Sequence, residues 1–193
     1  MGAEYELKYR ADRACQQKIA ERYSSKWAEI SMETTYYDTP SGALSAKRYM
    51  LRKRLENGIS VCTLKTSGKG NLRGEWETES DTIASAVPIL CKLSCPSDLA
   101  ELCEEGLIPI CGARFTRRAK LLEFPDFTAE LALDEGILFS GNQQIPLCEI
   151  EIELKTGNKD ALDAFAAGCA AEFGLVPEEK SKFARALALY KEV

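Results

Sequence analysis

The stretch EYELKYR, from Glu4 to Arg10, alternates strictly between charged and apolar side chains. The charged positions are Glu4, Glu6 and Lys8, and the apolar positions are Tyr5, Leu7 and Tyr9. Successive side chains of a β-strand point to opposite faces of the sheet. The stretch therefore predicts a strand with one apolar face and one face that carries only acids and a base.

The same alternation recurs in later stretches of the chain. Positions two residues apart carry charged or hydrogen-bonding side chains at Arg52 and Arg54, at Thr63 and Lys65, at Arg73, Glu75, Glu77 and Glu79, and at Glu149, Glu151 and Glu153, and Glu130 and Asp134 share a face with Ala132 between them. A solvated polar face is the simplest interpretation of any one strand. Taken together, however, like charges side by side destabilise a sheet unless something bound between them compensates. Charged faces that turn inward, with helices covering the apolar faces, resolve this conflict.

The strands are predicted to be linked mostly as hairpins. Asn57-Gly58 is the pair favoured in a two-residue type I′ turn between alternating strands. Apolar residues at helical spacing predict helices after Asp12, after Asn158 and over residues 178–190. Since no linker or repeat divides the chain, we expect a single domain over residues 1–193. The predicted fold class is α+β, an eight-stranded antiparallel β-barrel that forms a tunnel with a charged lumen and is flanked by helices.

The composition narrows the chemistry. The chain has no histidine, which excludes Ser-His and Cys-His catalytic pairs and the commonest zinc ligand. Its eight cysteines include no CxxC pair, so we expect most of them to be reduced. No apolar run approaches the roughly 20 residues of a membrane helix, and the net charge of −5 gives no reason to expect nucleic-acid binding. We expect a cytoplasmic protein that binds neither a membrane nor nucleic acid.

The charged faces contain two opposed sets of side chains. The acids, which suit a hard divalent cation, are Glu4, Glu6, Asp134, Glu149, Glu151 and Glu153. The bases, which suit phosphate, are Lys8, Arg52, Arg54, Lys65, Arg73 and Arg117. A short polyphosphate that carries magnesium or manganese uses both sets at once.

Eight short motifs follow one another along almost the whole chain. They are E-x-E-x-K from Glu4, YYDT from Tyr36, L-R-K-R ending at Arg54, T-L-K ending at Lys65, R-G-E-W-E from Arg73, L-D-E-G with Asp134, E-I-E-I-E-L from Glu149, and S-K at Ser181 and Lys182. In this order they resemble the CYTH, or triphosphate tunnel metalloenzyme, superfamily. The resemblance implies an eight-stranded antiparallel tunnel that binds triphosphate-containing substrates with Mg²⁺ or Mn²⁺.

The resemblance also implies roles for individual residues. The implied phosphate-binding residues are Lys8, Arg52, Arg54, Lys65, Arg73, Arg117 and Lys182. The implied metal-binding and water-positioning acids are Glu4, Glu6, Asp134, Glu149, Glu151 and Glu153, with Glu75, Glu77 and Glu130 as supporting tunnel acids. Catalysis is assigned to Glu4, Glu6 and Lys8. One departure is Ala119, which stands where the family often has a second basic residue.

The predicted function is metal-dependent hydrolysis of inorganic triphosphate to pyrophosphate and phosphate. A class IV adenylate cyclase, a thiamine or nucleoside triphosphatase, and a noncatalytic polyphosphate-binding module are the alternatives. No purine-reading motif or aromatic-rich base platform is visible, which favours a substrate without a large organic group. The sequence leaves monomer and homodimer open.

Overall fold

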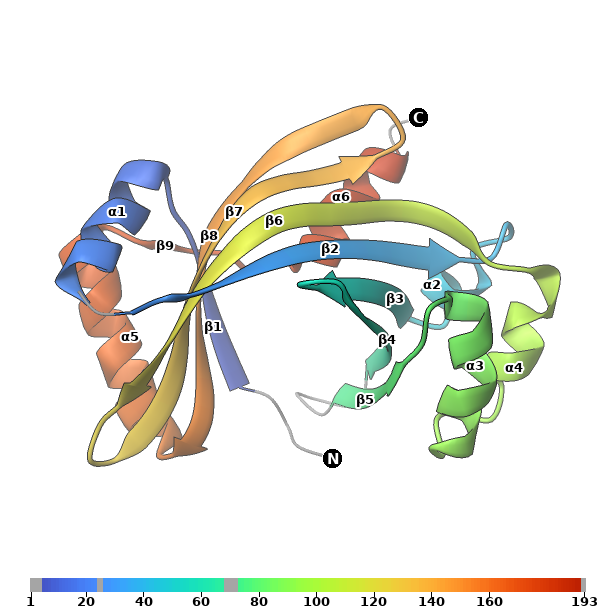
Figure 1. Cartoon of the computed structure of the whole chain (residues 1–193), viewed down its shortest axis with the longest axis horizontal. Helices are drawn as coiled ribbons and strands as arrows, with labels where there is room; N and C mark the ends of the chain where they lie inside the picture. The colour runs from blue at the N-terminus through green and yellow to red at the C-terminus, as the bar shows by residue number, and fades with distance from the viewer. Residues whose placement is uncertain (1–4, 24–25, 68–72, 192–193) are drawn as a thin grey trace.

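The computed structural model describes residues 5–23, 26–67 and 73–191, and its centre is one curved antiparallel sheet (Figure 1). The strands of the described part are β1 (Tyr5–Arg10), β2 (Ala28–Asp38), β3 (Tyr49–Glu56), β4 (Ile59–Ser67), β5 (Arg73–Glu79), β6 (Ile108–Glu123), β7 (Phe127–Ser140), β8 (Gln143–Gly157) and β9 (Val176–Pro177). Their order across the sheet is β5-β4-β3-β2-β6-β7-β8-β1-β9. The predicted α+β class and the antiparallel arrangement are confirmed.

The sheet differs from the predicted closed barrel at its two ends. In the described part of the chain, β1 pairs with β8 and β9 and not with β5. The short strand β9 was not predicted. It pairs Tyr9 with Pro177, and the amide of Glu178 donates to the carbonyl oxygen of Lys8. The outer edge of β1 is thus hydrogen-bonded to the β9 segment from Lys8 to Arg10, and among the described residues β1 and β5 share no strand pairing.

The hairpin between β3 and β4 forms where the sequence places it. Asn57 and Gly58 have φ angles of 50° and 90°. Positive φ at both central residues defines the type I′ turn, which suits the twist of paired strands. The register that follows sets Arg52 opposite Thr63 and Met50 opposite Lys65. Residues directly opposite in an antiparallel pair share a face, so Arg52 and Lys65 lie on the same side of the sheet.

The helices pack near the two sides of the curved sheet. They are α1 (Arg13–Arg22), α2 (Ala43–Ala46), α3 (Ile83–Lys92), α4 (Leu99–Leu102), the 3₁₀ turn η1 (Cys103–Glu105), α5 (Lys159–Phe173) and α6 (Lys182–Lys191). Figure 1 shows α1 beside α5 on one side, and α3 beside α4 on the other. Asp12 caps α1 by accepting from the amide of Cys15, and Asn158 caps α5, so both helices begin where the sequence predicts.

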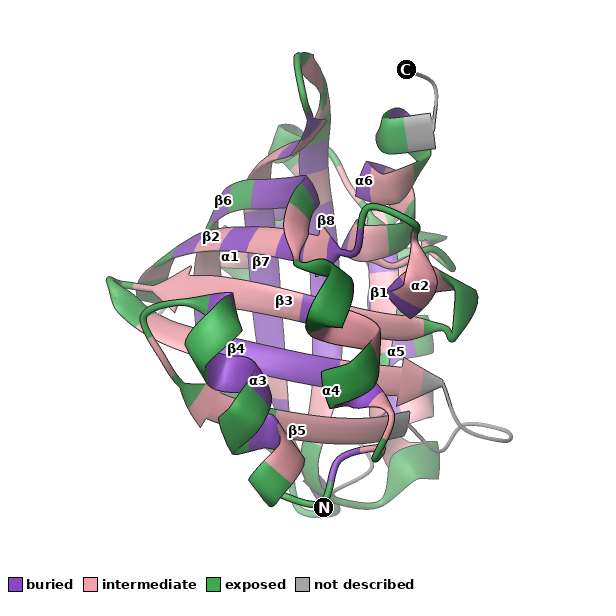
Figure 2. Ribbon diagram, turned by 90° about the vertical axis from the view of Figure 1, so that its right-hand side faces the viewer, coloured by how far each residue is buried: buried purple, intermediate pink, exposed green. Residues whose placement is uncertain are grey.

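Apolar faces of the strands are covered by these helices, and the buried residues lie mainly on the strands and on the inward sides of the helices (Figure 2). One core cluster joins β1, β7 and β8 to α1 and α5, and includes Tyr9, Leu131 and Ile150. A second joins β3 and β4 to α2, α3 and α4 around Leu51 and Leu64.

The predicted division between apolar and charged faces holds on β1, β3 and β8. On β2 and β6 the face that carries Arg117 is largely apolar, because Met32, Tyr36 and Phe115 form a third core cluster with Ala186 of α6. No helix in the described residues combines the length and apolarity needed to cross a membrane.

Candidate active site

A cavity of about 170 Å³ lies on the charged side of the sheet. Four strands and the helix α6 contribute its six cationic side chains, which are Lys8, Arg52, Arg54, Lys65, Arg117 and Lys182. Its acidic side chains are Glu6, Glu151 and Glu153, and its other lining residues are Tyr36, Met50, Ser181 and Phe183. We call this space the charged cavity. Because cations outnumber acids on its lining, it attracts anions although the chain as a whole is negative.

The arginines of β3 are weakly neutralised. Arg54 donates from Nε to the hydroxyl of Thr34 at 3.1 Å, and its Nη1 lies 3.5 Å from a carboxylate oxygen of Glu56. Burial, followed by the charge of Arg52, lowers the pKa of the Arg54 guanidinium. The Nη2 atom of Arg52 lies 3.7 Å from an oxygen of Glu77. Two adjacent guanidinium groups with such long contacts to acids favour the binding of a polyanion.

The acids of β5 support this cationic wall. Glu75 lies 2.9 Å from the ammonium of Lys65 and 4.0 Å from Arg52. Glu77 accepts a hydrogen bond from the buried hydroxyl of Thr63 at 2.8 Å. Glu75 and Glu77 thus contact side chains at or beside the charged cavity but do not line it themselves.

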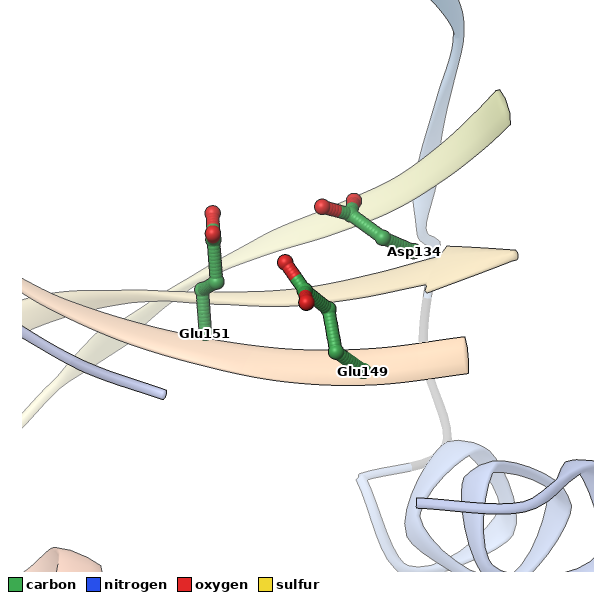
Figure 3. Close-up of side chains that lie close together, drawn as sticks. All are labelled: Asp134, Glu149 and Glu151. Atoms are coloured by element: carbon green, nitrogen blue, oxygen red, sulfur yellow. The ribbon is translucent and has the colours of Figure 1, made fainter. Parts of the chain in front are cut away.

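Three acids, one of which is the cavity-lining Glu151, converge beside the charged cavity, and Figure 3 shows their carboxylates turned toward one another. Asp134 of β7 and Glu149 and Glu151 of β8 each offer an oxygen within 4.8 Å of the others, so the group could hold a metal ion. The ammonium of Lys182 lies among them. It is 2.8 Å from Asp134 and 2.7 Å from Glu151, and it contacts Glu149 as well. We call these acids the inner acid cluster.

Two arginines complete the surroundings of the inner acid cluster. Arg117 donates from Nε and from Nη2 to the two oxygens of Asp134, both at 2.8 Å, and its Nη2 also contacts Glu151. Arg185 of α6 contacts the second oxygen of Glu149. Forked contacts of this kind are among the stronger hydrogen bonds of proteins.

These ion pairs set the ionisation of the site. Burial favours the neutral form of Glu151, but the charges of Lys182 and Arg117 outweigh it and hold its pKa below the ordinary value. Burial also opposes the charge on Lys182, yet its carboxylate neighbours raise its pKa. The pKa of Glu149 is raised, chiefly because this carboxyl group is buried. At neutral pH Lys182 is therefore an ammonium and Glu151 a carboxylate.

A second row of acids crosses three neighbouring strands closer to solvent. Glu153 of β8 is the register partner of Glu6 on β1 and of Glu130 on β7, so the three side chains share a face. Their side chains are 24%, 34% and 28% exposed, respectively. Lys155 lies 2.8 Å from Glu153 and 3.9 Å from Glu130. We call Glu6, Glu130 and Glu153 the outer acid row.

The structure thus brings together most of the residues that the sequence selects. All the predicted phosphate-binding residues whose side chains are described line the charged cavity, whereas the side chain of Arg73 and the whole of Glu4 lie outside the described residues. The predicted metal-binding acids divide between the inner acid cluster and the outer acid row. Ala119, where a second base was missing, is buried and lies opposite Ala132.

Sequence reasoning missed two residues that hold the acids in place. Arg185 was missed although it follows Lys182 by three positions on a helix, the spacing that puts two side chains on one face. Gln16 of α1 was also missed. Its buried amide donates to the carbonyl oxygens of Asp134 and Glu149, at 2.9 and 3.0 Å, and so joins α1 to both acid-bearing strands. Nothing in the sequence around Gln16 indicates this role.

Comparison with known proteins places the chain in a family. Residues 2–187 match the CYTH domain, so the chain belongs to the CYTH family. An inorganic triphosphatase of Haemophilus influenzae is 33% identical over 138 residues, which are 70% of this chain and 39% of that protein. The match therefore spans about two fifths of that relative's length.

Solved structures share the fold at lower identity. HpAC1 of Hippeastrum, a candidate adenylyl cyclase with a dominant triphosphatase activity, superposes with a TM-score of 0.70 at 21% identity, covering 98% of this chain and 95% of that one. The PH1819 protein of Pyrococcus horikoshii superposes with a TM-score of 0.62 at 23% identity, covering 96% and 98%. These similarities establish a CYTH-like fold.

Proposed function

We propose that this protein hydrolyses inorganic triphosphate to pyrophosphate and phosphate with the help of a divalent metal ion, Mg²⁺ or Mn²⁺. The observation that carries the proposal is the convergence of six cationic side chains from four strands and α6 on one cavity that also has acids on its wall. The inorganic triphosphatase among the relatives supports the same reaction.

The cations of the charged cavity would bind the phosphate chain. Arg52 and Arg54 present forked donors that fit phosphate oxygens, whereas Lys8 and Lys65 act as point charges. Charge that develops on the phosphates during in-line attack would be stabilised by groups already fixed in place, which is the main source of catalysis in phosphoryl transfer. We assign Arg73 to this set from the sequence.

We assign the divalent metal ion to the outer acid row. Its donors are carboxylate oxygens, the ligands that Mg²⁺ and Mn²⁺ prefer, and their partial exposure leaves room for water. Glu6 and Glu153 would hold the ion together with Glu4, which the sequence adds to this face. A bound metal ion would polarise phosphate oxygens and lower the pKa of a coordinated water. Glu6 and Lys8, with Glu4, would then lie at the reacting end of the substrate.

The aromatic residues of the cavity favour an inorganic substrate. Among its described lining residues, the aromatic side chains are Tyr36 and Phe183. Their ring centroids are 4.9 Å apart, so the two rings pack on each other. Neither ring is then placed as an open platform for a nucleobase or a thiamine ring. The proposal accordingly ranks hydrolysis of inorganic triphosphate above cyclisation of ATP.

The proposal extends to the whole chain. We place residues 1–193 in one domain. We expect it to act in the cytoplasm on a small triphosphate, as a monomer or a homodimer, without nucleic acid or a membrane.

A pair of neighbouring substitutions on β3 tests the assignment of the cavity. Arg52→Met removes a cavity cation, and we expect it to raise KM for inorganic triphosphate by about tenfold or more, because a hydrogen bond to a charged group contributes about 1.5–3 kcal/mol. Lys53→Met is the matched control. Lys53 does not line the charged cavity, and its ammonium donates to the carbonyl oxygen of Asp81 at 2.6 Å. Equal effects of the two substitutions on KM would contradict the assignment.

A further inference from the structure

We infer that the inner acid cluster is a clamp for the ammonium of Lys182 and not a metal site, and that Arg185 and Glu149 are positioning residues of this clamp. The inference rests on the proposed function only in taking a divalent cation as the competing occupant. It reassigns Asp134, Glu149 and Glu151, which the sequence places among the metal-binding acids.

The first argument is that every carboxylate oxygen of the inner acid cluster already contacts a cationic donor. Asp134 uses Oδ1 for Arg117, and Oδ2 for both Arg117 and Lys182. Glu151 uses Oε1 for Lys182 and Oε2 for Arg117. The same division of oxygens occurs at Glu149, where Lys182 contacts Oε1 and Arg185 contacts Oε2. A metal ion could bind only after it displaced several of these donors.

The second argument is charge balance. Asp134, Glu149 and Glu151 supply three negative charges, and Arg117, Lys182 and Arg185 supply three positive ones. Arg117 and Arg185 also approach Glu130 and Glu178, at 3.8 and 3.7 Å. A divalent ion placed among the three acids would still meet the three cations already in contact with them, which is unfavourable in a buried site.

The third argument is burial. The side chains of Asp134 and Glu149 are 0% exposed. Mg²⁺ requires near-octahedral coordination and usually keeps several of its waters. Two fully buried carboxylates covered by an ammonium offer no surface for such a hydrated ion. The outer acid row also contacts cations, but its three acids are 24–34% exposed and are register partners on neighbouring strands, so a hydrated ion can reach them.

The clamp has a mechanical consequence for the cavity. Lys182 is the first residue of α6, and α6 packs against β6 and β7. Fixing its ammonium on β7 and β8 fixes the end of α6 that lines the cavity through Lys182 and Phe183. Arg185 continues the chain of ion pairs, since its Nη1 lies 3.7 Å from Glu178, the residue directly after β9. The clamp thus holds α6 and the β9 segment on the sheet.

Binding of Mn²⁺ to the full chain without substrate tests the inference, with free Mn²⁺ measured by electron paramagnetic resonance. Four variants are compared with the unsubstituted protein: Glu149→Gln, Glu6→Gln, Lys182→Ala and the control Lys180→Ala, which removes an exposed lysine two residues from the clamp. We expect Glu149→Gln to retain the Mn²⁺ affinity and Glu6→Gln to weaken it by at least about tenfold. Lys182→Ala vacates the centre of the inner acid cluster, and we expect it to bind one additional Mn²⁺ per chain, which Lys180→Ala does not.

The opposite results overturn the inference. If Glu149 is a metal ligand, Glu149→Gln loses Mn²⁺ as Glu6→Gln does, and Lys182→Ala gains no second ion. If Glu149→Gln fails to fold, the number of ions bound by Lys182→Ala decides alone. Failure of the proposed function is distinguishable, because the unsubstituted protein would then neither bind Mn²⁺ through Glu6 nor hydrolyse triphosphate, while a gain of Mn²⁺ in Lys182→Ala would still support the clamp.

Discussion

Some cations of the charged cavity stabilise the fold, and others are available to a ligand. Arg117 represents the first group and Arg54 the second. Both guanidinium groups lie among the cavity-lining residues. Arg117 makes a forked contact to the fully buried Asp134 and also contacts Glu151. Arg54 has a hydroxyl partner and one distant carboxylate. We predict that Arg117→Met destabilises the protein strongly and that Arg54→Met does not.

The magnitude follows from what each substitution leaves behind. Removing Arg117 leaves a buried carboxylate without its main partner, and loss of one member of a buried ion pair costs about 3–5 kcal/mol. With a urea slope of about 2 kcal/mol per M, the unfolding midpoint falls by about 2 M. Removing Arg54 loses a hydrogen bond worth about 1 kcal/mol. The substitution also removes the repulsion between Arg54 and Arg52, which is the second cause, after burial, of the lowered pKa of Arg54.

Equilibrium urea unfolding, followed by both fluorescence and circular dichroism, measures this difference. Coincident transitions establish that unfolding is two-state, so that the two free energies of unfolding can be compared. Calorimetric titration with inorganic triphosphate then shows whether Arg54→Met loses affinity while it keeps its stability. Equal losses of stability in the two variants would refute the division of the cations into structural and ligand-binding groups.

Three further predictions concern the pH dependence and the packing of the sheet. Since the pKa of Glu151 is lower in the folded protein than in the unfolded chain, its stabilising contribution is complete above about pH 5 and is lost as the pH falls. The difference in free energy of unfolding between the unsubstituted protein and Glu151→Gln should therefore shrink from pH 7 to pH 4. A constant difference would contradict this prediction. Asp38 is buried and accepts from three backbone amides, so Asp38→Ala should lower the free energy of unfolding by about 3 kcal/mol in urea titration, with Asp38→Asn in between. A Cβ atom on Gly136 would lie 2.2 Å from the carbonyl oxygen of Arg114, so Gly136→Ala should lower the melting temperature, whereas Gly168→Ala, where a Cβ meets nothing within 4 Å, should not.

Alternation within single strands made much of the site predictable. A period of two is a local property of the chain, so the charged faces of β1, β3 and β8 could be assigned before the strands were paired. The turn at Asn57-Gly58 fixed one register through its own backbone preference. These local signals were sufficient to collect Lys8, Arg52 and Lys65 in one cavity.

The different roles of identical residues could not be predicted in this way. Glu149 and Glu153 occupy equivalent positions in EIEIEL, yet one is fully buried and the other is 24% exposed. Their environments differ because Lys182 and Arg185 of α6 contact Glu149, whereas Glu153 pairs with Lys155. The position of α6 depends on long-range packing. The pairing of β9 with β1, which uses the edge that a closed barrel would need, is equally nonlocal. Arg185 became visible as a site residue only once α6 was placed.

The most direct test of the proposed hydrolysis measures release of phosphate and pyrophosphate from inorganic triphosphate. ATP and thiamine triphosphate are assayed beside it, each with Mg²⁺, Mn²⁺ or a chelator. The account predicts metal-dependent turnover that is fastest with inorganic triphosphate, that stops in chelator, and that falls sharply in Glu6→Gln. Turnover that persists in chelator, or formation of cyclic AMP from ATP without hydrolysis of inorganic triphosphate, would contradict it.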